Sequence, residues 1–181
     1  MVATARLIKQ EHPDASVVFI GPCASKKLEA SRRTVRSDVD FVITFEELTG
    51  MFEAKGILLD EIKAMDEMKD ATAAGRGYGV AGGVANAIKE CIEKYYPGTP
   101  VNIQHAESLA ECKKALLLAK AGKMNGCLIE GMACPGGCIA GAGTNIAIPV
   151  AAKAVDKFKN EAEKKVPDES VDQEMVELEK E

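Results

Sequence analysis

The sequence lacks an apolar run long enough to cross a bilayer, and its first residues lack the charged-then-apolar pattern of a signal peptide. We therefore expect a cytoplasmic protein with no membrane partner. It also lacks a face rich in Lys and Arg, and its net charge is -5. This charge argues against general binding to nucleic acid, because no surface stands out that would neutralise phosphates.

Histidine is scarce, with two residues, whereas the chain has six cysteines. In the reducing cytoplasm, cysteines do not favour a disulfide framework, and closely spaced ones are typical of metal ligands or catalytic thiols. Cys91 and Cys112 fall among apolar residues in helical patterns. A free cysteine in such a place acts as a small apolar side chain, so we interpret these two as structural.

The 181 residues are enough for one domain, or for one lobe of a larger protein. Strands are predicted over residues 16–21, 39–44, 101–105 and 126–130, and helices over residues 2–12, 45–54, 84–96, 108–121 and 145–165. This alternation predicts an α/β fold, with a small, mainly parallel sheet of about four strands flanked by helices. We take residues 1–165 as this lobe and residues 166–181 as an acidic tail.

Several local signals support these assignments. Residues 16–21 form a β-branched and aromatic run, which is typical of a strand buried on both faces of a parallel sheet. Thr44 followed by Glu47 is a capping-box pattern that predicts the start of a helix. Residues 24–36 are predicted to form a loop, whereas residues 57–74 remain ambiguous.

The most informative stretch is residues 130–143, which places Cys134 and Cys138 four positions apart among five glycines. Glycine allows the backbone to turn sharply and to approach a bound group closely. Because a buried strand is predicted before this loop and a helix after it, the loop lies where α/β sheets bind their ligands. A second glycine-rich loop, residues 75–83, does not have P-loop spacing. We predict that it approaches the cysteine loop closely and walls the site.

Three cysteines lie in glycine-rich segments at strand ends, namely Cys23, Cys134 and Cys138. Thiolates in such places suit zinc or an iron–sulfur cluster, both of which normally take four protein ligands. Cys127 could be the fourth, but its place inside a strand favours a core residue. His105 is another candidate, although a histidine at a strand end more often satisfies a backbone group. The fourth ligand is therefore expected from further chain or from a partner.

Two segments resemble signature motifs of the iron-only ([FeFe]) hydrogenases. Residues 21–29 read Gly-Pro-Cys-Ala-Ser-Lys-Lys-Leu-Glu, and residues 130–138 read Glu-Gly-Met-Ala-Cys-Pro-Gly-Gly-Cys. The family patterns are Met-Pro-Cys-x-x-Lys-x-x-Glu and Glu-x-Met-Ala-Cys-x-x-Gly-Cys-x-x-Gly. Residues 38–48 and 75–88 also look like that family, and the resemblance runs to about residue 158.

This resemblance implies an H-cluster, in which a 4Fe–4S cubane is joined through one thiolate to a two-iron unit carrying CO and cyanide. It assigns Cys23 and Cys134 as cubane ligands and Cys138 as the bridge between the two parts. It assigns Lys26 as a donor to a cyanide ligand, which would be a strong charge-assisted contact. Pro22, Met132 and Ala133 are expected to enclose the two-iron unit.

The family's first motif, Thr-Ser-Cys-Cys-Pro, does not occur in this sequence. The resemblance therefore implies the C-terminal half of the catalytic domain, with an N-terminal lobe of the same protein supplying the fourth cubane ligand. The parent would interconvert protons, electrons and H₂, while this half alone is expected to be inactive. Expected partners are that lobe, H₂, protons, and a ferredoxin-like electron carrier or a sensory domain. The surface that the lobe would cover makes self-association plausible.

The sequence departs from the family pattern at Gly21, where catalytic members carry Met, and at Ala81, where they usually carry Ser or Thr. These changes resemble sensory members, which are thought to report H₂ or redox state. Three functions thus remain open: a lobe of a hydrogenase, an H₂-sensing or redox-sensing module, and an unrelated α/β domain with a simple iron–sulfur or zinc site.

Overall fold

The structure is a computed structural model that describes residues 1–32, 38–63 and 71–166. Its contacts divide the chain into two compact units, each described by itself below. The first holds the described residues of 1–65 and 141–145, and the second holds those of 66–140 and 146–173. The predicted tail lies outside the described residues except for Val166, as do parts of the predicted loop 24–36 and of the ambiguous stretch 57–74.

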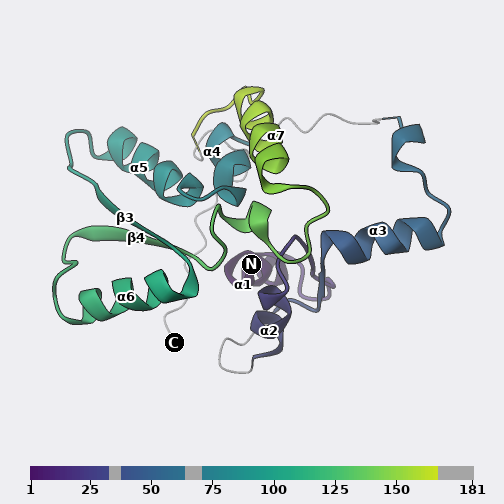
Figure 1. Ribbon diagram of the computed structural model, residues 1–181, viewed down its shortest axis with the longest axis horizontal. Coiled ribbons are helices and arrows are strands. Elements are labelled where there is room, and N and C mark those ends of the chain that lie inside the picture. Colours follow the sequence, from purple (N-terminus) through teal and green to yellow (C-terminus); the bar gives the residue numbers. More distant parts are fainter. Residues whose placement is uncertain (33–37, 64–70, 167–181) are drawn as a thin grey trace. The chain divides into compact units, whose positions relative to one another are not determined.

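The first unit is built from helices and two short strands in alternation (Figure 1). Its elements are α1 (Val2–Glu11), β1 (Val18–Ile20), α2 (Ser25–Ser31), β2 (Phe41–Ile43), α3 (Phe45–Ala54) and the 3-10 helix η2 (Leu59–Glu61). β1 and β2 pair in parallel, with Phe19 opposite Val42. The helix and strands predicted at this end of the sequence are therefore confirmed.

Helix α3 begins at the capping box that the sequence predicts. The Glu47 N–H donates to Thr44 Oγ1 at 3.2 Å, and the Thr44 N–H donates to Glu47 Oε2 at 2.9 Å. Beyond the helix, Gly56 has a φ of 67°, a left-handed conformation that glycine adopts readily. Both ends of α3 are thus set by local residues.

Two local predictions for the first unit are wrong. Val18 and Ile20 are 45% and 46% exposed, so β1 is not buried on both faces. Alternate side chains point to opposite faces, and the face shared by these two residues stays open in this two-stranded sheet. Residues 25–31 form α2 where a loop was predicted. That segment contains no proline or glycine, and Lys26 and Glu29 pair at the i,i+3 spacing that supports a helix.

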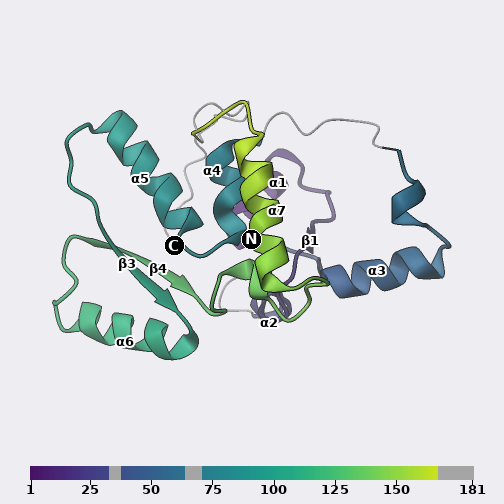
Figure 2. The same ribbon diagram turned by 45° about the horizontal axis from the view of Figure 1, so that its top comes forward.

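The second unit contains α4 (Ala73–Arg76), η3 (Gly77–Gly79), α5 (Gly83–Tyr95), β3 (Asn102–Glu107), α6 (Leu109–Lys120), β4 (Cys127–Met132), η4 (Cys138–Ala140) and α7 (Ile148–Asn160). β3 and β4 form a parallel pair. In both views this pair lies between α5 and α6 (Figures 1 and 2). The Cys112 thiol of α6 donates to the Ala106 carbonyl at 3.5 Å, in keeping with the predicted structural role.

Helix α7 packs on α4 in this unit. The Arg76 guanidinium lies 4.1 Å from the centre of the Phe158 ring, and its Nη1 donates to the Phe158 carbonyl at 2.9 Å. α7 is shorter than the predicted 145–165, and Pro149 lies in its first turn as expected. Proline is tolerated there because its missing N–H has no helical partner in any case.

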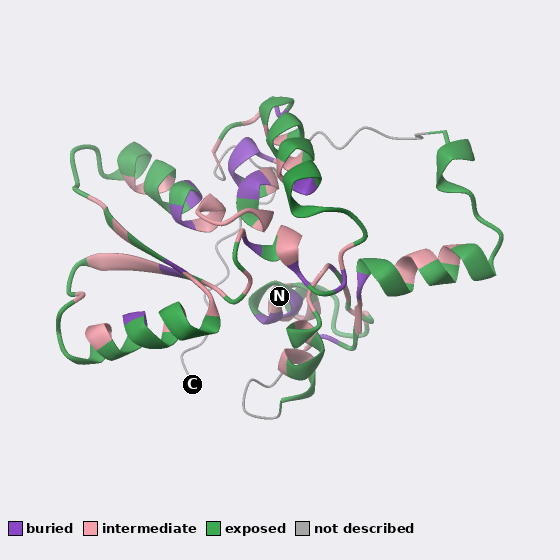
Figure 3. Ribbon diagram, viewed as in Figure 1, coloured by how far each residue is buried: buried purple, intermediate pink, exposed green. Residues whose placement is uncertain are grey.

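Buried residues lie in short, scattered stretches of the ribbon (Figure 3). Among the described residues, the buried apolar ones are small. They are Val2, Ala5, Val39, Ala73, Ala74, Ala85, Ala87, Ala106, Ala115, Ala151 and Ala162. Large apolar side chains lie outside, with Leu109 75% exposed and Phe41 62% exposed. Among the described helices, none is long and apolar enough to span a membrane. The predicted α/β class with parallel strands is confirmed, and the four strands form two separate pairs.

Candidate functional site

The carboxylate of Glu130 is buried in the second unit and accepts several hydrogen bonds. Glu130 lies in β4 and is 7% exposed. Its Oε2 accepts the Gly82 N–H at 2.6 Å, and its Oε1 accepts the Val84 and Ala85 N–H groups at 3.1 Å each. These donors are at the start of α5, where backbone N–H groups have no partner within the helix. Glu130, a residue of strand β4, therefore caps the N-terminus of helix α5.

His105 completes the surroundings of this carboxylate. It is the parallel partner of Glu130 in the β3–β4 register, and its Nδ1 lies 3.0 Å from Glu130 Oε2. Its partner is thus a carboxylate, which corrects the expectation of a backbone group. Burial raises the pKa of Glu130, but hydrogen bonds from Ala85, His105 and Gly82 outweigh it and leave that pKa below the ordinary value. Glu130 is accordingly ionised at neutral pH.

The cysteine loop that follows β4 turns at two glycines. Gly136 and Gly137 have φ angles of 90° and 94°, which are left-handed conformations that favour glycine. The Gly137 N–H donates to the Cys134 carbonyl at 3.0 Å, and the Gly136 N–H donates to Glu107 Oε2 at 2.8 Å. This turn separates Cys134 from Cys138, so it decides where the two thiols lie.

The second glycine-rich loop packs directly on this turn. The Ala81 N–H donates to the Gly136 carbonyl at 3.1 Å. A Cβ added to Gly137 would lie 2.7 Å from the Gly79 carbonyl oxygen and would also strike the Ala81 nitrogen, so no larger residue fits at position 137. The predicted close approach of residues 75–83 to the cysteine loop is confirmed.

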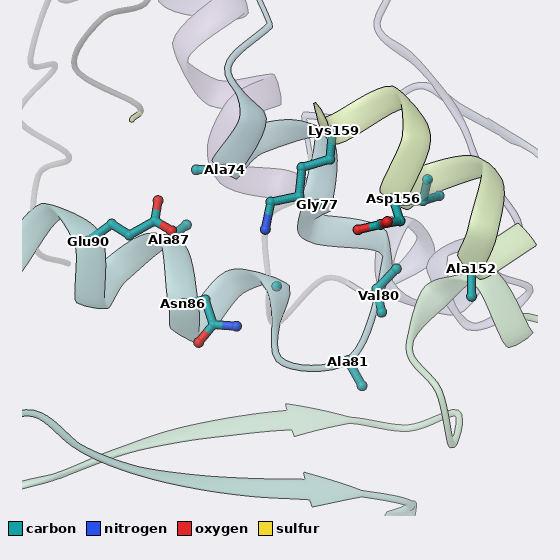
Figure 4. Close-up of a pocket in the computed structure, with 12 residues that line it drawn as sticks. Ala74, Gly77, Val80, Ala81, Asn86, Ala87, Glu90, Ala152, Asp156 and Lys159 are labelled. Atoms are coloured by element: carbon teal, nitrogen blue, oxygen red, sulfur yellow. The ribbon is translucent and has the colours of Figure 1, made fainter. Parts of the chain in front are cut away.

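A small cavity lies behind this second loop, on the side of α7 (Figure 4). Its volume is about 150 Å³, and Val80, Ala81 and Gly83 of the loop contribute to its wall. Lys159 and Asp156 of α7 reach its edge (Figure 4). The loop therefore has the cysteine turn on one side and open space on another.

The first motif lies in the first unit, at the end of β1. Cys23 is half-buried. The carbonyl of Pro22, the residue before Cys23, accepts the Gly143 N–H at 3.0 Å. Lys26 is on the first turn of α2, where its Nζ lies 2.5 Å from Glu29 Oε2. A Cβ added to Gly21 would lie 2.9 Å from the Phe19 ring, so the Phe19 ring would have to move for a larger residue.

The structure brings two of the predicted cysteines onto one loop. Cys134 is half-buried and Cys138 is exposed, while Cys23 belongs to the other unit. Within residues 1–32, 38–63 and 71–166, no group of three or more Cys, His, Asp or Glu side chains is gathered for a metal ion. The donors fit an iron–sulfur cubane in kind, because thiolates are its usual ligands, and they number three of the usual four.

The remaining predicted residues lie near the end of β4 or within it. Met132 is half-buried at the last position of the strand, and Ala133 is exposed in the loop that follows. Cys127 is half-buried in β4, where Asn102 Nδ2 lies 3.4 Å from its sulfur. Cys127 thus lies within a strand as predicted, but it is half-buried and is not one of the buried core residues of the described chain.

Residues 1–142 match the family model for the C-terminal domain of the iron only hydrogenase large subunit. The chain belongs to this family. The match includes the motif around Cys23 and the motif around Cys134 and Cys138. Membership of this domain family removes the alternative of an unrelated α/β domain.

Solved structures of this family share the fold. A variant of the [FeFe]-hydrogenase HydA1 from Chlamydomonas reinhardtii superposes with a TM-score of 0.62 at 20% identity, covering 94% of this chain and 61% of that chain. A second structure, which concerns oxygen inactivation of an [FeFe]-hydrogenase by modification of the H cluster 2Fe subcluster, has a TM-score of 0.54 at 20% identity. It covers 91% of this chain and 59% of that chain. This chain thus spans about three fifths of these relatives, and a search of curated protein sequences gave no match.

Sequence reasoning missed three contacts that shape the site. They are the contact of Glu130 with the start of α5, the contact of Glu107 with Gly136, and the pairing of His105 with Glu130. The motif itself was a signal for Glu130, because a carboxylate at the end of a buried strand needs several donors. No local pattern pointed to Glu107, whose partner Gly136 is 29 residues away.

Proposed function

We propose that this chain is the H-cluster-binding lobe of an iron-only hydrogenase, whose parent interconverts protons, electrons and H₂. The observation that carries this proposal is the turn at Gly136 and Gly137. It holds Cys134 and Cys138 on one loop within a sequence that matches the family model. The cluster, when bound, supplies the redox and H₂ chemistry, and the protein supplies ligation, exclusion of water and hydrogen bonds.

In this proposal each cysteine has a distinct task. Cys23 and Cys134 would hold the cubane, and Cys138 would hold the cubane and the two-iron unit together. The Gly136 N–H donates to the Glu107 carboxylate, and the Gly136 carbonyl accepts the Ala81 N–H. These two hydrogen bonds fix the loop that carries Cys134 and Cys138. Anchored ligands lose little freedom when they bind a metal centre.

Lys26 would act on the charge of the two-iron unit. Its ammonium group is paired with Glu29 at 2.5 Å, which directs the side chain and leaves further N–H donors. A cationic donor facing an anionic cyanide ligand makes a strong hydrogen bond. Pro22, Met132 and Ala133 would exclude water from the same part of the site.

The proposal includes partners. The chain offers three thiols in these motifs, so an N-terminal lobe of the same protein would supply the fourth ligand, and this chain alone would be inactive. Each unit has exposed large apolar side chains, such as Phe41 in the first and Leu109 in the second, which suit surfaces that another protein region covers or that self-associate. A ferredoxin-like carrier or a sensory domain would exchange electrons or signals, in the cytoplasm.

A sensory module is the second candidate, and Gly21 and Ala81 favour it. At Gly21 the Phe19 ring occupies the place of a side chain, so the Met that catalytic members carry there would fit only if this ring moved. Ala81 has no hydroxyl group, although its N–H holds the cysteine turn. A site changed at these two positions would bind H₂ or change redox state without fast turnover.

Anaerobic reconstitution with iron and sulfide tests the proposal. The iron count, the EPR spectrum and H₂ activity would be measured for the chain alone and with the N-terminal lobe added in trans. A cubane that forms only with the added lobe supports the three-plus-one ligand set, and H₂ turnover after maturation separates enzyme from sensor. Tight binding of a single zinc ion by the chain alone would contradict the proposal.

A further inference from the structure

A continuous series of contacts joins Glu130 to the turn between the two cysteines. Glu130 Oε2 accepts the Gly82 N–H at 2.6 Å. The adjacent Ala81 donates its N–H to the Gly136 carbonyl at 3.1 Å. Within one short loop, Gly82 is therefore bound to the carboxylate, and the neighbouring Ala81 is bound to the cysteine turn.

Part of this loop lacks packing on the side of α7. Val80, Ala81 and Gly83 border the cavity of about 150 Å³, so part of the loop faces open space (Figure 4). Open space provides no contacts that would resist a displacement of the loop. Two backbone hydrogen bonds act within the loop, from the Val80 N–H to the Gly77 carbonyl at 3.2 Å and from the Gly83 N–H to the Val80 carbonyl at 3.0 Å. The hydrogen bonds to Glu130 are the ones that tie the loop to strand β4, from which the cysteine turn continues.

The carboxylate is well placed for this task. It is 7% exposed and has four donors, three from the backbone and one from His105. Hydrogen bonds to an ionised acceptor are roughly twice as strong as neutral ones. Removing the carboxylate would leave these N–H groups without their acceptor, two of them at the first turn of α5.

We propose that Glu130 is a positioning residue for the cluster site, because it holds the loop that sets the conformation between Cys134 and Cys138. Groups outside a metal site commonly orient its ligands in this way. The role toward a cluster rests on the proposed function. The ordering of the turn, however, is a property of the metal-free chain and can be measured there.

The first test uses the metal-free full chain and its Glu130→Gln variant. Gln keeps the shape but loses the charge, and its amide N–H₂ cannot accept from the backbone. Hydrogen–deuterium exchange in the peptide covering residues 131–140 is expected to rise about tenfold, the factor for losing one hydrogen bond to a charged group. The alkylation rate of the Cys134 thiol should rise as well, and the alkylation rate of Cys23 in the same sample serves as the internal standard. Glu93→Gln, an exposed change on α5, is the matched control and should leave both rates unchanged.

Three further variants separate positioning from a general loss of stability. Glu107→Ala removes the acceptor of the Gly136 N–H directly, so it is the positive control that shows the exchange of a loosened turn. If Glu130→Gln fails to fold, His105→Ala tests the proposal, because it removes one donor of the Glu130 carboxylate, and unchanged exchange at residues 131–140 would then overturn it. His105→Ala should have a smaller effect, because three backbone donors remain. His105→Gln should restore the wild-type rate, since its amide can donate to Glu130. The proposal would be overturned if the Glu130→Gln variant folds and its residues 131–140 exchange at the same rate as in the Glu93→Gln control.

A second arm adds iron and sulfide together with the N-terminal lobe. Glu130→Gln is expected to weaken iron retention about 10- to 100-fold and to alter the EPR line shape. If the wild-type chain binds no cluster but Glu130→Gln still raises exchange at residues 131–140, positioning stands and the proposed function fails. If the wild type binds a cluster and the variant matches it in exchange and EPR, the positioning role is wrong.

Discussion

Gly143 lies directly against Thr44, the residue that caps α3. A Cβ added at position 143 would lie 2.5 Å from Thr44 Cβ and 2.7 Å from Thr44 Cγ2. The Gly143 N–H donates to the Pro22 carbonyl at 3.0 Å, and its own carbonyl accepts the Glu46 N–H at 3.2 Å. One glycine thus joins the loop that carries Cys23 to the first turn of α3.

Gly143→Ala should destabilise the chain by about 1–3 kcal/mol, because the added methyl group overpacks a site that has no room. Urea denaturation measures the free energy of unfolding. Gly50→Ala, within α3, has no atom within 4 Å of the new methyl group and should stabilise by about 0.5–1 kcal/mol. Equal effects of the two substitutions would contradict the close contact with Thr44.

Gly137→Ala should cost more than Gly98→Ala, although both glycines have positive φ angles of 94° and 82°. The left-handed backbone alone costs about 1–2 kcal/mol for an alanine. Position 98 is open, whereas a Cβ at position 137 meets Gly79 and Ala81, which adds about 1–3 kcal/mol of overpacking. Thermal unfolding of both variants measures this difference, and equal midpoints would show that the two glycine loops do not pack together.

Substitution of single cysteines by alanine should separate ligands from packing residues. Under the proposed function, and in chain that has been matured with a two-iron unit in the presence of an N-terminal lobe, Cys134→Ala should lose most of the bound iron, because a cubane with fewer thiolates is poorly held. Cys138→Ala should lose the two-iron unit and disturb the cubane. Cys91→Ala should keep the iron of the wild type. Iron analysis with EPR checks each variant, and full iron in Cys134→Ala would exclude that residue as a ligand.

The stability conferred by Glu130 should depend on pH. Its folded-state pKa lies below the ordinary value of 4.5, through hydrogen bonds that outweigh burial. Its contribution is therefore fully present above about pH 4.5 and is lost as pH falls through the lower folded pKa. The difference in unfolding free energy between wild type and Glu130→Gln should be constant near pH 7 and shrink towards pH 3. Thermal unfolding across this range measures it, and a constant difference down to pH 3 would contradict the lowered pKa.

Local signals in the sequence predicted several elements correctly. The capping box of Thr44 and Glu47 starts α3, and Gly56 follows its end in a left-handed conformation, as local sequence patterns imply. The same holds for Ser108, whose Oγ accepts the Glu111 N–H at the start of α6. Such contacts join residues a few positions apart, so a pattern in the chain is enough to reveal them.

Helix α2 and strand β1 show where local patterns did not suffice. Residues 25–31 combine good helix formers with two serines, and their helix has no side-chain N-cap hydrogen bond that a sequence pattern could reveal. The apolar run of β1 was interpreted as buried on both faces. Its burial depends on which segments cover each face of the sheet, and no residue within the run encodes that.

The sequence by itself determined the α/β class, the four strands, helices α1, α3, α5, α6 and α7, and the family, because periodicity, caps and cysteine motifs are written in neighbouring residues. Only the tertiary structure decided that His105 and Glu130 form a pair, that Glu107 holds Gly136, and that Gly143 closes on Thr44. Each of these contacts joins residues at least 25 positions apart. They arise from strand register and loop packing, which depend on the whole folded chain rather than on any one segment.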